Sequence, residues 1–460
     1  MRSAPGSERR IAEVAGRCRL SALILLGALL IGSSGSAQPQ PVQPTPTATT
    51  PASVGIPGSE LTVYLMTMGP GDEVWEKFGH NAIWIHDSLR NTDIAYNWGL
   101  FDFSASDFMP RFLKGDMLYW MGGFDEQATL DSYRRANRTV MAQELNLTPA
   151  QRVSLANFIE WNAQPENRFY HYDYFRDNCS TRVRDALDRV LGGTIRKATE
   201  RAPSGTTFRS HTRRLTQDTP WIYLGTLLGL GRPVDRPISR WEEMFLPVRM
   251  HDDLRGIRVS DTSGASVPLV RSERTLFMAS RPPEPLEPSS HIAVYAIAGI
   301  LVGFVALLLR YVVDRGSSRA RPALIVVAGA WHLAAGLGGT VLAALWTLTN
   351  HVYSYQNENL LQANPLSLVV AVMTFAALGW RRRSNGSGAV VERRTSQLAW
   401  VAAGVAVAGL ALKVLPSFNQ VNGEIIALAL PAHLGIALSL RRRMLEPPGT
   451  GRRRVSTTKS

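Results

Sequence analysis

Cysteine is scarce in this 460-residue chain, which contains only Cys18 and Cys179. Cys18 lies in a basic segment, before an apolar stretch at residues 20–31 and small residues that end at Ala37. This order is typical of a secretory signal over residues 1–37, with an uncleaved signal anchor as the alternative. In either case the following domain is exported. Once the signal is cleaved, Cys179 is a lone thiol in an oxidising compartment, where thiols usually pair.

Two further features are missing, and each excludes a class of protein. The sequence contains no internal repeat. The nearest pair of candidate metal ligands, His80 and His86, has no third ligand of convincing spacing, so no zinc site and no cofactor are predicted.

The net charge of +13 raises the possibility of nucleic-acid binding, which the placement of the arginines argues against. Arginine clusters at residues 381–383, 393–394, 441–443 and 452–454 all lie near apolar segments. That placement is the one that membrane topology requires, so no nucleic-acid partner is expected.

Residues 291–445 are dominated by apolar runs and are predicted to form an all-α domain of five membrane spans. The predicted spans are residues 292–313, 322–348, 367–380, 396–415 and 421–440. All the arginine clusters fall on one side of the membrane if the exported domain lies on the other. The basic tail at 446–460 is then cytoplasmic, and the protein is expected in the inner membrane.

The exported part is predicted to be an α+β domain over residues 57–250, after a disordered Pro- and Thr-rich linker at 38–56. Strands are expected at 60–69, 80–86, 93–103 and 169–175, and a capped helix at 147–162. A hairpin and a Pro-rich linker at 251–290 lead to the membrane.

Cys179 lies in "YDYFRDNCSTRVRDALDRVLGG" (172–193), at the predicted start of an amphipathic helix. A helix N-terminus can lower the pKa of a thiol, and a nearby base would make that thiol a nucleophile. His80 in "KFGHNAIWI" is the best candidate for the base. The alternative is that Cys179 is a small buried hydrophobic residue.

A family resemblance favours the nucleophile. The run "FGHNAIWI … YNWGLFDF … FLKGDMLYWM … NRTV … QELNLTPAQ … PENRFYHYDYFRDNCSTRVRDAL" resembles the periplasmic domain of a bacterial membrane protein family. That family is typified by a lipoprotein N-acyltransferase of Bacteroides-type bacteria, and the resemblance covers about residues 60–250. The five-span half is also similar to that family's membrane domain. The order of histidine before cysteine further resembles permuted papain-like enzymes such as lecithin:retinol acyltransferase.

The resemblance implies that Cys179 is the nucleophile and His80 the base, with a polar third residue on a neighbouring strand. Asn97 in "YNWG" fits that third position, although it could equally be a residue of the turn at the strand end. The backbone N–H of Cys179 would contribute to an oxyanion hole. The family motifs also include Asp102, Lys114, Asp116 and Arg138, to which the resemblance assigns no chemistry.

Other candidate residues carry weaker hypotheses. Arg176 and Arg182 could contact a phosphate headgroup or simply face solvent, and His86 is expected to be structural. The loop at 350–366 is unusually polar, so His351, Asn357 and Asn359 are proposed to form a lipid or lipoprotein entrance, with a solvated loop as the alternative. His332, inside the second span, is expected to face the bundle.

Together these features predict a cysteine-dependent acyltransferase. An acyl chain would pass from a phospholipid to a Cys179 thioester and then to an amine, expected to be the N-terminus of a lipoprotein. Two alternatives remain: a Cys–His peptidase or amidase acting on cell-wall peptide, and a non-enzymatic membrane sensor or assembly factor.

Overall fold

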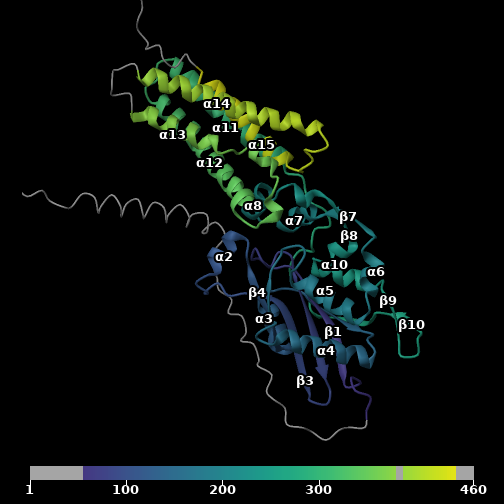
Figure 1. Cartoon of the computed structure of the whole chain (residues 1–460). Helices are drawn as coiled ribbons and strands as arrows, with labels where there is room; N and C mark the ends of the chain where they lie inside the picture. Colours follow the sequence, from purple (N-terminus) through teal and green to yellow (C-terminus); the bar gives the residue numbers. More distant parts are fainter. Residues whose placement is uncertain (1–54, 380–386, 442–460) are drawn as a thin grey trace, which may run out of the picture.

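The computed structural model describes residues 55–379 and 387–441, which form a sheet-containing domain followed by a bundle of long helices (Figure 1). The predicted signal with Cys18, most of the predicted linker, Arg381–Arg383 and the basic tail lie outside the described residues. The α+β class predicted for the first domain and the all-α class predicted for the second are both confirmed.

The first domain is organised around one antiparallel sheet of seven strands, in the order β11-β5-β1-β2-β3-β4-β6. The strands are β1 (Leu61–Met68), β2 (His80–Asp87), β3 (Thr92–Leu100), β4 (Leu118–Asp125), β5 (Val140–Leu145), β6 (Phe169–His171) and β11 (Val270–Phe277). Because β1 and β2 lie at the centre, the residues that begin β2 are held by neighbours on both sides.

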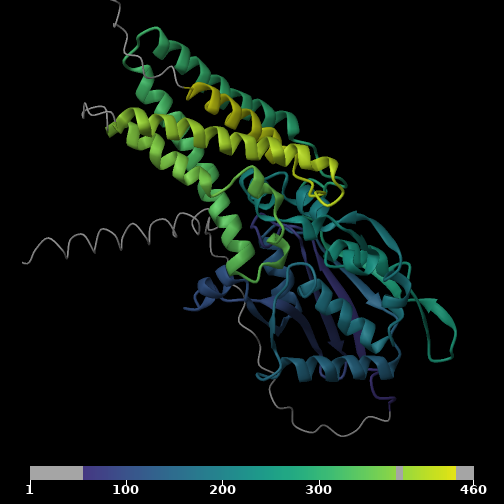
Figure 2. The same cartoon turned by 45° about the horizontal axis from the view of Figure 1, so that its top comes forward.

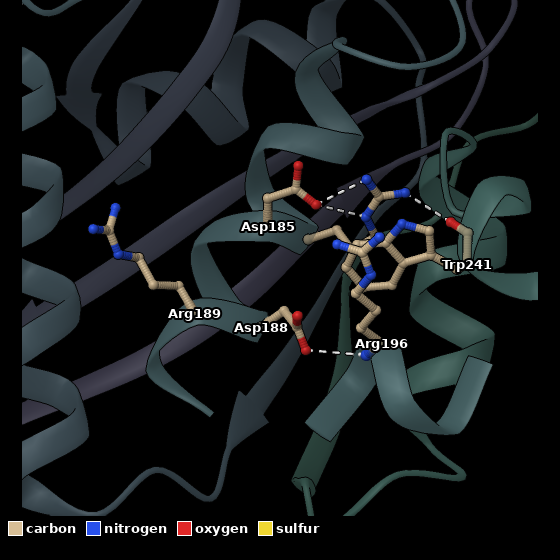
Figure 3. Close-up of a pocket in the computed structure, with 6 residues that line it drawn as sticks. Asp185, Asp188, Arg189, Arg196 and Trp241 are labelled. Atoms are coloured by element: carbon tan, nitrogen blue, oxygen red, sulfur yellow. Dashed lines mark hydrogen bonds and ion pairs between the residues drawn. The ribbon is translucent and has the colours of Figure 1, made fainter. Parts of the chain in front are cut away.

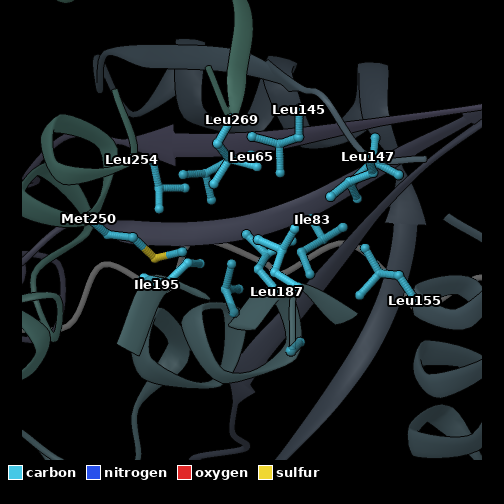
Figure 4. Close-up of a cluster of buried hydrophobic side chains, with 14 of the residues drawn as sticks. Leu65, Ile83, Leu145, Leu147, Leu155, Leu187, Ile195, Met250, Leu254 and Leu269 are labelled. Carbon is cyan, nitrogen blue, oxygen red and sulfur yellow. The ribbon is translucent and has the colours of Figure 1, made fainter. Parts of the chain in front are cut away.

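Alternation along the strands supplies two buried faces. In β1, Val63 and Leu65 lie on one face, whereas Met66 and Met68 lie on the other. Two long helices, α4 (Pro149–Ala163) and α5 (Cys179–Val190), cover the first face, where Leu155 and Leu187 are fully buried (Figure 4). The helix α3 (Glu126–Arg135) contributes Leu130 to the second face. Helix α5 is therefore anchored across the strand that carries His80.

A set of short elements follows α5 and connects the sheet to the membrane helices. These are α6 (Thr194–Thr199), β7 (Pro203–Thr207), α7 (Phe208–Thr216), α8 (Pro220–Gly229), η1 (Arg232–Asp235), β8 (Pro237–Ser239), α9 (Arg240–Glu243) and α10 (Pro247–Leu254). A fully buried ion pair between Arg209 and Asp235 closes this region, and Arg209 also donates to the carbonyl of Gly231. The ion pair therefore holds α7 against the segment that follows α8.

The predicted boundary at residue 250 is too early. The hairpin of β9 (Arg258–Ser260) and β10 (Ser266–Pro268) forms as predicted, but β11 then pairs with β5 and becomes an edge of the main sheet. The predicted strand at 169–175 is also shorter than expected, because the chain turns after His171. The pairing of β11 with β5 joins residues far apart in the sequence, so no local pattern predicts it.

In the part of the second domain that the structure describes, five α-helices lie near the five predicted spans: α11 (Ile292–Asp314), α12 (Ala320–Leu348), α13 (Leu366–Gly379), α14 (Ser387–Ala411) and α15 (Gly423–Ser439). Within the described residues, four stretches are long and apolar enough to cross a membrane, and α15 is a shorter apolar helix. Gly303 of α11 and Gly435 of α15 meet backbone to backbone, since a Cβ on Gly435 would lie 2.3 Å from the Cα of Gly303. Such close approach is typical of helix packing in membranes.

The two domains interlock at the loops that join the membrane helices (Figure 2). Helix α8 is apolar and packs on the bundle, where Tyr223 and Leu227 meet Ile425. Its final carbonyl groups accept hydrogen bonds from the amides of Asn357 and Asn359 at 2.8–3.1 Å. A helix leaves these carbonyls without partners, so the membrane domain caps a helix of the first domain.

Candidate active site

Cys179 is the first residue of α5. Asn178 precedes it as N-cap, and its side-chain oxygen accepts from the N–H of Thr181 at 2.9 Å while the Thr181 hydroxyl accepts from the N–H of Asn178. The amide of Asn178 also donates to the carbonyl of Phe245 at 2.9 Å. The thiol is thus held at a helix N-terminus by a reciprocal cap that the sequence "NCST" encodes.

His80 begins the central strand β2 directly after a tight turn. Gly79 has a φ of +81°, and a Cβ there would lie 2.7 Å from the carbonyl oxygen of Met68. A residue with a side chain would clash with β1, so glycine is required for the chain to enter the strand at this point.

Asn97 of β3 orients the imidazole of His80. Its Oδ1 lies 2.9 Å from Nε2 of His80, and its Nδ2 donates to the carbonyl of Ala95 at 2.9 Å. Because that second bond fixes which end of the amide faces the ring, Nε2 must carry the proton. The neutral ring then has its lone pair on Nδ1. The neighbourhood predicted for His80 and Asn97 is present, and their catalytic roles stay a prediction.

The residues that follow His80 and Cys179 bring the two together. The amide of Asn81 lies 3.0 Å from the hydroxyl of Ser180, and both side chains are completely buried. The hydroxyl of Ser180 donates in turn to the carbonyl of Met244 at 2.7 Å. This buried bond fixes the position of α5 on β2. The sequence indicates it only by the polar residue that follows each of His80 and Cys179.

Gly99 lets the thiol approach β3. Its φ is +89°, and a Cβ there would lie 3.3 Å from the Cβ of Cys179 and 3.9 Å from the ring of Tyr172. Any larger residue would occupy the space beside the sulfur. Sequence reasoning did not single out this glycine.

Burial keeps both candidate residues neutral. It raises the pKa of Cys179 to about 11, although the backbone N–H groups of Asn81 and Ser180 at the sulfur oppose the effect. It also lowers the pKa of His80 to about 4, although the bond to Asn97 works in the other direction. Desolvation disfavours the charged form of each group. At neutral pH the thiol of Cys179 and the imidazole of His80 are therefore both uncharged.

Arg138 lies close enough to act on both groups: its charge lowers the pKa of His80 further and opposes the rise in the pKa of Cys179. Its side chain is buried and bonds the carbonyl of Gly69 and the carboxylate of Glu76, both near 3 Å, and it stacks on Tyr133. The ring of Tyr133 is nearly parallel to that of His80, with 6.4 Å between the centroids. Arg138 and Tyr133 thus form the wall behind the imidazole, and nothing in their sequence spacing indicates this.

Aromatic rings surround the other side of the thiol. Tyr172 stacks on Tyr119 with 4.4 Å between the centroids and lies 6.5 Å from Tyr170. Burial raises the pKa of Tyr170 and Tyr172 well above the ordinary value, and the nearby Cys179 adds to this effect. This side of the sulfur is therefore lined by aromatic rings, which suit an uncharged chain.

Comparison with known proteins places the chain. A family model described as the Lnb N-terminal periplasmic domain matches residues 54–214, and the Lnb transmembrane domain matches residues 291–384. Together the two models cover more than half of the sequence. The chain belongs to the Lnb family. No curated protein and no solved structure matches the chain.

The Lnb periplasmic domain therefore contains Cys179, His80 and Asn97, and the predicted Bacteroides-type family is confirmed. The protein is a membrane protein with an exported domain, as predicted. Within the described residues, no three His, Cys, Asp or Glu side chains gather as a metal site.

Arg176 and Arg182 were expected near a headgroup. Arg182 forms a two-point ion pair with Asp177 and lies over the ring of Tyr170, 4.1 Å from its centroid. Arg176 is exposed and its backbone N–H donates to Asp173 at 2.9 Å. Arg182 thus already has a structural role, and headgroup binding by either residue stays a prediction.

His86 lies at the other end of β2 from His80. Its Nδ1 is 3.0 Å from Asp93, which also accepts from the indole of Trp84 at 2.7 Å. This is the structural role that the sequence favoured.

His351, Asn357 and Asn359 use their polar atoms to join the two domains. His351 lies 2.9 Å from the carbonyl of Phe112 and 3.2 Å from the hydroxyl of Tyr174, while the two asparagines cap α8. These contacts hold the loop at 350–366 against the first domain. They leave the predicted entrance role without support. His332 is fully buried inside the bundle, as predicted.

A hollow of about 290 Å³ lies beside α5 (Figure 3). Arg184 pairs with Asp185, stacks on Trp241 and donates to its carbonyl, and Asp188 accepts from the backbone of Arg196. These charged side chains already have partners within the protein. Their contacts join α5 to α6 and α9.

Alkylation of Cys179 should report the neutral thiol. Since only the thiolate reacts, and the pKa is about 11, the rate with iodoacetamide should rise about tenfold per pH unit from pH 7 to 9.5 without a plateau. The measurement uses the full chain with Cys18→Ser, so that one thiol is counted. A plateau near pH 8.5 would indicate an ordinary thiol, and a pH-independent rate down to pH 6 would indicate a thiolate–imidazolium pair.

Proposed function

We propose that this protein is a thiol-dependent acyltransferase that moves an acyl chain from a phospholipid through a Cys179 thioester to an amine. The acceptor is the N-terminal amine of a lipoprotein. The observation that carries the proposal is the geometry at Cys179. The thiol lies at a helix N-terminus and bonds the backbone N–H of Asn81, the residue after a histidine that Asn97 orients, within aromatic surroundings.

The first half-reaction uses His80 as base and then as acid. Nδ1 of His80 takes the thiol proton as the sulfur attacks the ester carbonyl, and the lysophospholipid leaves with that proton on its oxygen. The N–H groups of Cys179 and Ser180 at the helix N-terminus would stabilise the oxyanion. The second half-reaction transfers the acyl group to the amine and returns a proton to the sulfur. No cofactor is needed.

Three features support acyl transfer over peptide hydrolysis. The thiol lies among apolar rings, the catalytic domain is docked on a membrane bundle, and the histidine-before-cysteine order is similar to permuted papain-like acyltransferases. A hydrolase would need only one anchoring helix. Because Cys179 and His80 are both uncharged at neutral pH, the thiol is a weak nucleophile until His80 takes its proton during attack on a bound carbonyl.

The topology that we propose places the catalytic domain in the periplasm, with the chain in the inner membrane and its C-terminus in the cytoplasm. The exposed arginines 315, 319, 393, 394 and 441 lie at the ends of the helices away from the first domain. Positive residues favour the cytoplasmic side.

Mass spectrometry of lipoprotein N-termini tests the function. The chain would be expressed in a host depleted of its own N-acyltransferase, and N-terminal lipopeptides should gain one acyl group as an amide. The Cys179→Ala variant at equal expression should give no gain. Unchanged N-termini with the wild-type chain would contradict acyl transfer, and shortened cell-wall peptides would support the peptidase instead.

A further inference from the structure

A cluster of exposed and half-buried large apolar side chains lies on the periplasmic domain, around α2 (Phe108–Lys114) and the loop before it. We call it the aromatic surface, and it consists of Trp75, Phe101, Phe103, Phe108, Phe112 and Leu113. Phe103 is 51% exposed, and Trp75 and Leu113 are each 46% exposed. Exposed apolar patches of this kind mark contacts with a partner or a membrane.

Helix α2 contributes nothing to the core of its own domain. None of its residues is buried, although it carries two phenylalanines, a methionine and a leucine. The rings instead pack on one another, with centroids of Phe101 and Phe103 4.8 Å apart and those of Phe103 and Phe108 4.9 Å apart. An apolar helix none of whose residues is buried indicates that something else covers it.

Helix α2 lies beside the outer end of α12, as both views show (Figures 1 and 2). The carbonyl of Lys114 accepts from the N–H of Asn350 at 2.7 Å, and a Cβ on Gly115 would lie 2.9 Å from the backbone of Asn350. Just inside that end, Trp346 and Leu348 of α12 are 41% and 76% exposed. The aromatic surface therefore continues the lipid-facing surface of the bundle at the level where tryptophan marks the bilayer interface.

The charges at this surface suit the headgroup region. Asp102, Asp107 and Lys114 are exposed, and Arg111 pairs with Asp107 at 2.6 Å. The charges of this segment balance, so the apolar rings decide where it lies.

A row of rings leads from this surface to the thiol. Phe101 is 5.0 Å from Tyr119, and Tyr119 is 4.4 Å from Tyr172 by ring centroids. Tyr172 and Cys179 both lie against Gly99. The rings of Phe101, Tyr119 and Tyr172 therefore form a continuous aromatic row between the exposed rings and the glycine beside Cys179.

We propose that the aromatic surface is immersed in the outer leaflet of the membrane and that phospholipid acyl chains reach Cys179 along this row of rings. The second part rests on the proposed acyl transfer, whereas immersion in the bilayer does not. The acyl ester then enters from beside α2. The loop at 350–366 holds α2 against the membrane helices at this point.

Depth-dependent fluorescence quenching tests the immersion. The full chain carrying Cys18→Ser, Cys179→Ser and Phe103→Cys is labelled with bimane in nanodiscs of phosphatidylethanolamine and phosphatidylglycerol. The matched control carries Trp161→Cys, because Trp161 is 56% exposed on α4, at the far end of the same domain from the helices. Phosphatidylcholine with a nitroxide near its headgroup should quench the Phe103 label at least about twofold more than the Trp161 label. Equal quenching would overturn the proposal.

Acyl transfer gives a second readout. Phe103→Asp should slow transfer from bilayer phospholipid about tenfold, Phe103→Leu should restore most of it, and Trp161→Asp should have no effect. Equal rates for all three variants would overturn the delivery route even if the quenching result stands. If the wild-type chain transfers no acyl group, the proposed function fails, and the quenching experiment still decides whether the surface is immersed.

Discussion

Replacing Cys179 by alanine should lower acyl transfer by about 10³-fold or more, because no other group at this site can form the thioester. Asn178, Ser180 and the core of α5 are untouched, so the domain should fold normally. The measurement is the rate of amide formation on a lipopeptide with purified enzyme in phospholipid nanodiscs.

Two comparisons make this result decisive. Thermal unfolding of the variant should match that of the wild type, which excludes a loss through misfolding. Cys179→Ser should also be inactive, since a serine hydroxyl is far harder to deprotonate than a thiol beside a neutral imidazole. Retained function in both variants would contradict every reading in which the thiol reacts, and would favour a sensor or assembly role.

Replacing His80 by alanine should lower the rate by about 10²–10⁴-fold at neutral pH, because the thiol then has no base to take its proton. Because burial raises the pKa of Cys179 to about 11, few thiolates form without help at pH 7. Part of the activity should return as the pH rises towards 10, where the solvent removes the proton. The measurement is the pH dependence of the transfer rate for both proteins.

His86→Ala is the matched control, since it lies on the same strand and pairs only at the surface with Asp93. Its rate should stay close to that of the wild type. The first half-reaction of the wild type, followed as lysophospholipid release, should not slow between pH 7 and pH 5, because the pKa of His80 is about 4 and the ring stays neutral over that range. A base role for His80 would be contradicted by equal losses in both variants, or by a His80→Ala rate that does not rise with pH.

Much of the architecture could be predicted from local patterns. The α+β class, the hairpin at β9 and β10, the capping boxes at Thr148 and Asn178, and the positions of the five apolar helices follow from alternation, capping residues and hydrophobic length. These are short-range effects, and the residues that produce them are neighbours in the sequence.

The errors have a common physical cause. The edge strand β11 pairs with β5 over more than a hundred residues of intervening chain, and α8 inserts among membrane helices although its sequence precedes them. His351, Asn357 and Asn359 look like solvated loop residues, yet they cap and dock elements from the other domain. Such contacts depend on which surfaces of the folded chain meet, and hydrophobic periodicity does not predict which surfaces these are.

The sequence by itself determined the scarcity of cysteine, the apolar helices and the family, because residue type, hydrophobic length and motif order are properties of the chain. Only the tertiary structure decided the surroundings of Cys179. Asn97 fixes the proton on Nε2 of His80, Asn81 and Ser180 align strand with helix, and Gly99 leaves room beside the sulfur. It also decided that the thiol and the imidazole are neutral, since burial is a property of the folded chain that no residue carries alone.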